Sequence, residues 1–72
     1  MKTNKTQATL YIFHSLLKNG YIVKNEIQET LEINDLTFKR YIQELRAFLI
    51  NYNLGYEIVF IKEKNKYFLE KF

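Results

Sequence analysis

The hydrophobic positions between residues 34 and 52 recur at the spacing of one face of an α-helix. Four of them follow one another at intervals of four, three and four residues, namely Phe38, Ile42, Leu45 and Leu49. This spacing stacks side chains on one side of a helix, and Phe48 and Tyr52 continue the same side. Asn34 precedes the run and suits a helix cap, because its side-chain oxygen can accept a backbone N–H of the first turn. The pattern predicts an amphipathic helix over about residues 34–52.

The opposite side of this helix is mostly polar. A rotation of about 100° per residue places five positions there, namely Leu36, Lys39, Arg40, Gln43 and Ala47. Ile50 also projects on this outer side, so we expect it to be exposed. One side of the helix is therefore suited to a protein core, and the other presents two cations and an amide.

Two further helices are predicted before it. The first covers about residues 6–19 and ends at Gly20, a common helix stop, with an apolar stripe formed by Leu10, Tyr11, Ile12, Phe13, Leu16 and Leu17. The second covers about residues 25–32, with Asn25 as its expected cap and Ile27 and Leu31 on one face. Residues 1–5 are polar and are expected to form a flexible N-terminus.

The remaining hydrophobic segments have the composition of β-strands. Residues 56–61 and 66–71 are rich in β-branched and aromatic side chains and flank a polar turn, which predicts a hairpin. Residues 21–23 form a short apolar segment that can make a single β-bridge between helices. A hairpin alone is marginal in water, so it must pack on the helices. The predicted fold is mainly α with a C-terminal β-hairpin (α+β), in a single domain of residues 6–72.

Composition narrows the possible functions. The 72-residue chain has no Cys and a single His, His14, without an obvious catalytic or metal-binding partner. Catalysis needs a nucleophile–base pair, a metal cluster or a phosphate-binding loop, and the sequence contains none of these patterns. We therefore expect no enzyme, no metal and no cofactor. No apolar run approaches the roughly 20 residues of a membrane span, and the polar start lacks a signal peptide, so we expect a cytoplasmic protein with no membrane partner.

The net charge of +3 leaves two interpretations open. A positive balance suits nucleic acid or another anionic partner. The excess is small enough to be an ordinary solvated surface.

The helix order and its spacing resemble a known family. The positions that carry the resemblance are Val23, Ile27, Leu31, Glu32, Ile33, Asn34, Thr37, Phe38, Lys39, Arg40, Ile42 and Leu45, followed by strand segments 56–58 and 67–69. In this spacing the chain resembles the N-terminal winged helix-turn-helix domain of DeoR-type and WYL-domain bacterial transcriptional regulators, over about residues 6–70. It departs from that pattern at three positions. The family usually has a small residue at the position of Gln28 and often a glycine at that of Glu32. It commonly has an acidic residue at the position of Tyr41.

The resemblance implies that helix 34–52 reads the major groove of double-stranded DNA and that the 62–66 wing touches the backbone or minor groove. The DNA-binding residues that it implies are Asn34, Leu36, Thr37, Lys39, Arg40, Gln43, Lys62, Lys64 and Lys66. Arg40 and Lys39 can reach guanine or phosphate, Gln43 can pair with adenine, and Leu36 can meet a thymine methyl. Thr37 and the N–H groups of the first helical turn suit phosphate.

The resemblance and the surface composition predict two kinds of partner. One recognition helix per chain makes few phosphate contacts, so we expect a homodimer on two half-sites. The alternative function is a winged-helix protein–protein interaction module, an adaptor or inhibitor with little DNA binding, which would use its aromatic surface and Ile50.

Overall fold

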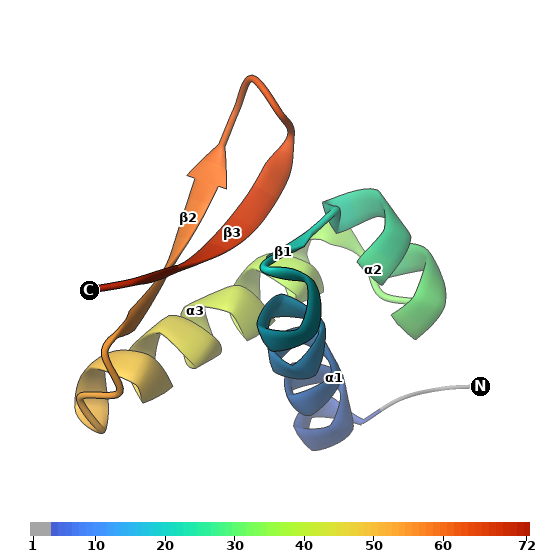
Figure 1. Cartoon of the computed structure of the whole chain (residues 1–72). Helices are drawn as coiled ribbons and strands as arrows, with labels where there is room; N and C mark the ends of the chain where they lie inside the picture. Colours follow the sequence, from blue (N-terminus) through green and yellow to red (C-terminus); the bar gives the residue numbers. More distant parts are fainter. Residues whose placement is uncertain (1–3) are drawn as a thin grey trace.

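The computed structural model describes residues 4–72, in which three helices pack together and a β-hairpin projects from them (Figure 1). Within these residues the element order is α1 Lys5–Asn19, β1 Tyr21–Ile22, α2 Lys24–Leu31, α3 Asp35–Asn51, β2 Tyr56–Ile61 and β3 Lys66–Lys71. The predicted α+β class, with three helices and a C-terminal hairpin, is confirmed. The topology is that of a winged helix. Residues 1–3 of the predicted flexible N-terminus lie outside the described residues.

Helix α1 has a cap at each end. The Asn4 side chain accepts a hydrogen bond of 2.8 Å from the backbone N–H of Gln7, so α1 begins one residue before the predicted start. At the other end Gly20 adopts the left-handed conformation with φ 82°, and its N–H donates to the Leu16 carbonyl at 2.8 Å. Glycine accepts this conformation without a Cβ penalty, so the predicted stop at Gly20 is confirmed.

Helix α2 differs from the prediction at its first turn. It begins at Lys24 and its cap is Val23, which makes no side-chain hydrogen bond, so the prediction of an Asn25 cap is wrong. Val23 has extended backbone angles because β1 immediately precedes it. At the other end Glu32 takes a left-handed conformation with φ 55°. Glycine adopts this conformation without a Cβ penalty, whereas the glutamate here carries that penalty.

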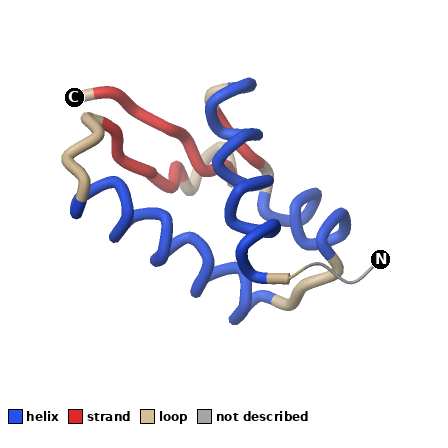
Figure 2. Tube along the Cα trace, turned by 90° about the horizontal axis from the view of Figure 1, so that it is seen from below, coloured by secondary structure: helices blue, strands red, loops and turns tan. Residues whose placement is uncertain are grey.

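Helix α3 begins as predicted. The Asn34 side chain accepts a hydrogen bond of 2.8 Å from the N–H of Thr37, and Asp35 places a negative charge at the positive end of the helix dipole. The helix ends at Asn51, and the loop that follows leads directly into the hairpin (Figure 2). The turn includes Asn53 with φ 51° and Gly55 with φ 80°.

The sheet has one more strand than the predicted hairpin. Its order is β1-β3-β2, all antiparallel, with Tyr21 opposite Phe68 and Ile22 opposite Tyr67. The apolar segment after α1 therefore forms a two-residue strand against β3 instead of a bridge between helices. Both hairpin strands have the predicted bounds.

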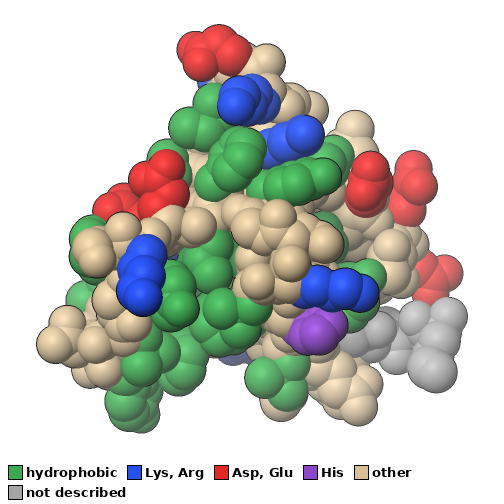
Figure 3. Space-filling view, viewed as in Figure 1, with side chains coloured by type: hydrophobic (Ala, Val, Ile, Leu, Met, Phe, Trp, Pro, Cys, Tyr) green, Lys and Arg blue, Asp and Glu red, His purple; other side chains and the backbone are tan. Residues whose placement is uncertain are grey.

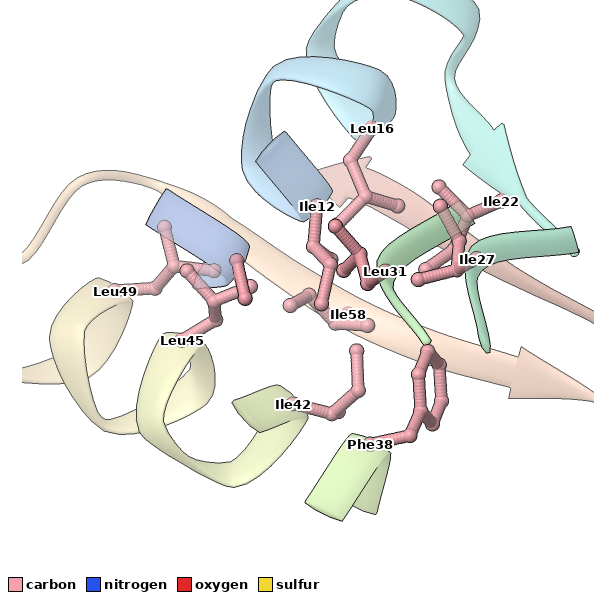
Figure 4. Packing of buried hydrophobic residues seen from close by; sticks show 11 residues of the cluster. Ile12, Leu16, Ile22, Ile27, Leu31, Phe38, Ile42, Leu45, Leu49 and Ile58 are labelled. Carbon is pink, nitrogen blue, oxygen red and sulfur yellow. The ribbon is translucent and has the colours of Figure 1, made fainter. Parts of the chain in front are cut away.

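The hydrophobic core lies where the three helices meet the sheet (Figure 4). The completely or almost completely buried residues are Ala8, Ile12, Leu16, Ile22, Ile27, Leu31, Phe38, Ile42, Leu45, Leu49 and Ile58. The four predicted core positions of α3 are all in this set. Among residues 4–72, no helix has both the length and the apolar character needed to cross a membrane.

Several predicted core residues lie outside this cluster. Tyr52 and Phe48 in α3 are 70% and 40% exposed. On α1 the side chains of Leu10, Tyr11 and Leu17 are also exposed. The predicted stripes are too wide, because a helix at the surface of so small a core buries only the residues that point straight into it.

Candidate nucleic-acid interface

The outer side of α3 exposes the residues that the sequence places there. We call this set the polar flank, and it consists of Leu36, Lys39, Arg40, Gln43 and Ala47, all of which are exposed. The four core residues of α3 hold the flank in position, because they pack on the opposite side of the same helix. Arg40 makes no ion pair within residues 4–72, so its guanidinium is available to an anionic partner.

Asn34 and Thr37 form the N-terminal cap of this helix. The Asn34 side-chain oxygen accepts the Thr37 N–H, and the Asn34 carbonyl accepts the N–H of Phe38 at 3.0 Å. The Thr37 N–H is therefore occupied by the cap, which leaves the Thr37 hydroxyl as its polar group at the helix start. The half-buried Thr37 side chain and the exposed Asn34 border the polar flank.

A carboxylate joins the two helices of the helix-turn-helix. Asp35 Oδ1 lies 2.7 Å from Lys24 Nζ of α2, and Asp35 Oδ2 lies 3.3 Å from Lys39 Nζ one turn along α3. The hydrogen bond from Lys24, followed by that from Lys39, lowers the pKa of the Asp35 carboxyl. The same hydrogen bond raises the pKa of Lys24. Part of the positive charge of the polar flank is therefore neutralised within the protein.

The register of the hairpin divides its side chains between two faces. Antiparallel partners share a face, and successive residues alternate. Ile58 is buried, so its partner Leu69 and the next pair, Phe60 and Tyr67, lie on the side of the helices. Phe68 and Lys66 consequently lie on the outer face of the sheet.

Two of the predicted wing lysines, Lys64 and Lys66, lie over the outer face of the sheet, whereas Lys39 of α3 lies at the side of α3 next to Asp35. Lys66 Nζ lies 4.4 Å from the ring centroid of Tyr21, and Lys64 Nζ lies 5.6 Å from that of Phe68. Both ammonium groups are held over aromatic rings of the outer face, an arrangement that is attractive for a cation. Lys62 is exposed at the loop of residues 62–65. In Figure 3 basic side chains lie next to hydrophobic ones just below the tip of the hairpin.

A shallow hollow of about 240 Å³ separates α3 from the hairpin. It is lined by Lys39, Ile42, Gln43, Arg46, Phe60 and Tyr67. Phe60 and Tyr67 contact each other with ring centroids 4.8 Å apart, and Tyr67 reaches the buried Phe38 at 5.3 Å. The polar flank, through Lys39 and Gln43, therefore meets the inner face of the hairpin, through Phe60 and Tyr67, at this hollow.

Arg46 fixes the hairpin relative to α3. Its Nε and one terminal nitrogen both donate to the carbonyl oxygen of Ile58, at 3.2 and 3.1 Å. The side chain is partly buried, where a charge-assisted hydrogen bond is stronger than at an open surface. This guanidinium therefore links α3 to strand β2, in addition to the core packing of Ile58.

Four residues of the site were not predicted. Phe60 and Tyr67 could have been found from the hairpin register, because Phe60 lies two positions after the buried Ile58. Arg46 and Lys24 carry no such signal, since their partners are a carbonyl 12 residues away and a carboxylate 11 residues away in the chain.

The described residues contain no group of three or more His, Cys, Asp or Glu side chains that is arranged to hold a metal ion. The chemistry of the site consists of cations, amides and aromatic rings. Comparisons with protein-family models, with curated proteins and with solved structures found no significant match to this chain.

Proposed function

We propose that the chain is a DNA-binding winged-helix transcriptional regulator that acts in the cytoplasm of a bacterium, as its resemblance to DeoR-type and WYL-domain regulators implies. Helix α3 enters the major groove, and the loop of residues 62–65 contacts the backbone or the minor groove. An α-helix with its side chains is about 10–12 Å across and the major groove is about 12 Å wide.

One observation carries this proposal: the polar flank of α3 and the inner face of the hairpin meet over a shared hollow. A duplex lying against the flank brings its backbone to Lys39 and Arg40 and its base edges to Gln43 and Leu36. Phosphate contacts position the protein, whereas contacts to base edges provide specificity. In this arrangement Phe60 and Tyr67 lie beside the sugar–phosphate backbone next to the reading helix.

The test is a fluorescence-anisotropy titration of a duplex at about 50 mM and about 200 mM salt. With roughly four to six phosphate contacts, the affinity is expected to fall by about 10²–10³-fold between the two conditions. The double variant Lys39→Gln/Arg40→Gln is expected to reduce the slope of log affinity against log salt by about two units, since each lost contact removes about 0.9.

The matched control is the double variant Lys18→Gln/Lys71→Gln. It removes the same charge from two exposed positions outside the polar flank, so it measures the effect of net charge alone. We expect it to change the affinity much less. Equal losses in the two double variants would reject the assignment of α3 as the recognition helix.

A second candidate function is a protein–protein interaction module. The pairing of Asp35 with Lys24 and Lys39 favours it, because it weakens the positive potential where DNA would bind. Absence of duplex binding at both salt concentrations would support this function in place of the first.

A further inference from the structure

A second surface of α3 has a different character from the polar flank. Between α1 and α3 lies a hollow of about 370 Å³, which we call the apolar groove and which is lined by Thr9, Leu10, Phe13, Glu44, Leu45 and Phe48. The Phe13 and Phe48 rings meet edge to face in it, with centroids 6.2 Å apart. Figure 3 shows hydrophobic side chains gathered between α1 and the C-terminal half of α3.

The apolar groove has a protruding neighbour. Tyr52 follows Phe48 by one helical turn, its ring centroid lies 5.4 Å from that of Phe48, and its side chain is 70% exposed. Leu10 on the other side of the groove is 63% exposed. Single exposed apolar residues are ordinary, whereas a contiguous set of them marks an interaction surface.

The charges at the groove are balanced. Lys5 Nζ and Glu44 Oε1 lie 2.8 Å apart, one on each helix, so the surface presents one cation and one anion. This balance offers nothing to nucleic acid or to a strongly charged peptide. It suits a partner that carries the same pair in the opposite order, because each Lys5 then faces a Glu44 of the other molecule.

We propose that a second copy of this chain docks in the apolar groove. In a two-fold interface the same patch contacts itself, so it must carry both a protrusion and the hollow that receives it. Tyr52 and the groove meet this requirement. A two-fold axis beside Phe48 places Tyr52 of each copy over the hollow of the other and brings the two Phe48 side chains together.

The dimer has a consequence for DNA that rests on the proposed function. The α3 helices run antiparallel across the axis, with Phe48 nearest to it and Lys39 nine residues further toward the N-terminus. At 1.5 Å per residue the two Lys39 positions lie about 27 Å apart along the helix direction. Side-by-side packing adds an offset of about 8–10 Å, which gives a separation of about 29 Å. Successive major grooves on one side of DNA lie about 34 Å apart, so the two polar flanks suit neighbouring half-sites.

The interface is small. Leu10, Phe48 and Tyr52 together expose roughly 300 Å² of apolar surface, judged from the size of aromatic and aliphatic side chains. A standard interface buries about 800 Å² per partner, so polar surroundings of the groove must contribute the rest. We therefore expect a weak dimer that forms only at micromolar or higher protein concentrations.

Sedimentation velocity of the 72-residue chain without DNA tests the proposal. Over a series from about 5 to about 500 μM, the mass is expected to rise from 8.8 kDa toward twice that value by mass action. The variants Tyr52→Glu and Leu10→Glu are expected to raise the dissociation constant by roughly tenfold or more, because each buries a charge against an apolar surface.

Ile50→Glu is the matched control. Ile50 is 76% exposed on the same helix, but it lies away from the groove, so this variant should dimerise like the parent. Circular dichroism melts establish that all three variants remain folded. A monomer at every concentration would overturn the proposal, as would an Ile50→Glu effect as large as that of Tyr52→Glu. The experiment contains no DNA, so failure of the DNA-binding function leaves its outcome unchanged.

Discussion

The polar flank and the apolar groove lie on the same helix, α3, and are supported by the same buried residues, but the first exposes charged and polar side chains and the second exposes apolar ones. The polar flank places Lys39 and Gln43 at the hollow beside the hairpin, whereas Phe48 lines the apolar groove between α1 and α3, with Tyr52 exposed next to it. The difference shows that α3 exposes cations and an amide in its N-terminal half and aromatic side chains in its C-terminal half.

The largest expected effect is a loss of stability that disrupts the polar flank and the apolar groove together. Phe38 is fully buried and packs on Tyr67 of the hairpin. Phe38→Ala is expected to cost about 3–5 kcal/mol of unfolding free energy, out of roughly 4–11 kcal/mol for a domain of this length. Chemical denaturation followed by circular dichroism measures it. Phe48→Ala, at a half-exposed position, should cost less than half as much and should affect only the groove.

The next effect separates the polar flank from the hairpin. Arg46→Gln removes the paired hydrogen bonds to the Ile58 carbonyl and is expected to cost about 1–3 kcal/mol, as for charge-assisted bonds in partly buried positions. Arg40→Gln makes the same chemical change at an exposed position of the same helix, and we expect it to stay within about 0.5 kcal/mol. Urea unfolding compares them. Equal costs would mean that Arg46 does not hold the wing.

A smaller effect concerns the start of the polar flank. Asn34→Ala removes the side-chain cap of α3 and is expected to cost about 1 kcal/mol. Asn25→Ala changes the same residue type near the start of α2, where Val23 is the cap, and should cost no more than about 0.5 kcal/mol. Thermal unfolding of the two variants checks the difference. A larger loss at Asn25 would contradict the capping scheme.

The smallest expected effect is a change in the charge of the polar flank that leaves the apolar groove unchanged. Asp35→Asn releases Lys24 and Lys39 and is expected to strengthen duplex binding several-fold at low salt, with a smaller gain at high salt because exposed charges are screened. Dimerisation should not change. Anisotropy titration and sedimentation measure the two properties, and weaker duplex binding by the variant would contradict the role of Asp35.

The same substitution alters the dependence of stability on pH. A carboxyl whose pKa is lowered in the folded state stabilises the fold above its ordinary pKa and loses this contribution as pH falls through the lowered value. The parent should therefore lose stability below about pH 4 in a way that Asp35→Asn does not. The raised pKa of Lys24 has the opposite effect on the pH dependence. Its contribution to stability is present at lower pH and is lost as pH rises above the ordinary lysine value of about 10.5. Thermal melts across this pH range measure the loss of stability at the acid end and at the alkaline end.

Local signals in the sequence predicted most of the fold. These signals act between residues that are about one helical turn apart. They are the caps at Asn34 and Gly20 and the spacing between successive core residues of α3, Phe38, Ile42, Leu45 and Leu49. Such signals can be interpreted without knowledge of the tertiary structure. The Asn25 cap failed because a neighbouring strand fixes the backbone at Val23, which is a tertiary effect.

The candidate site was less accessible to the same reasoning. The polar flank follows from helical rotation alone, so its exposure was predictable. The position of Lys64 and Lys66 on the outer face depends on the hairpin register and on pairing with Tyr21, a residue 45 positions before Lys66. The exposure of Tyr52 depends on how little of α3 so small a domain can cover.

The hydrogen bonds from Arg46 to Ile58 also bear on solubility. Strand β2 forms an open edge of the sheet, and its composition of Tyr, Ile, Val and Phe is typical of strands that pair with other chains. The Ile58 carbonyl points away from β3 and is occupied by the guanidinium. A strand arriving from another molecule must displace a charged side chain at the middle of the edge before it can extend the sheet. The contact of Arg46 with the Ile58 carbonyl is thus an obstacle to edge-to-edge pairing at β2, in the way that charged side chains commonly are on edge strands.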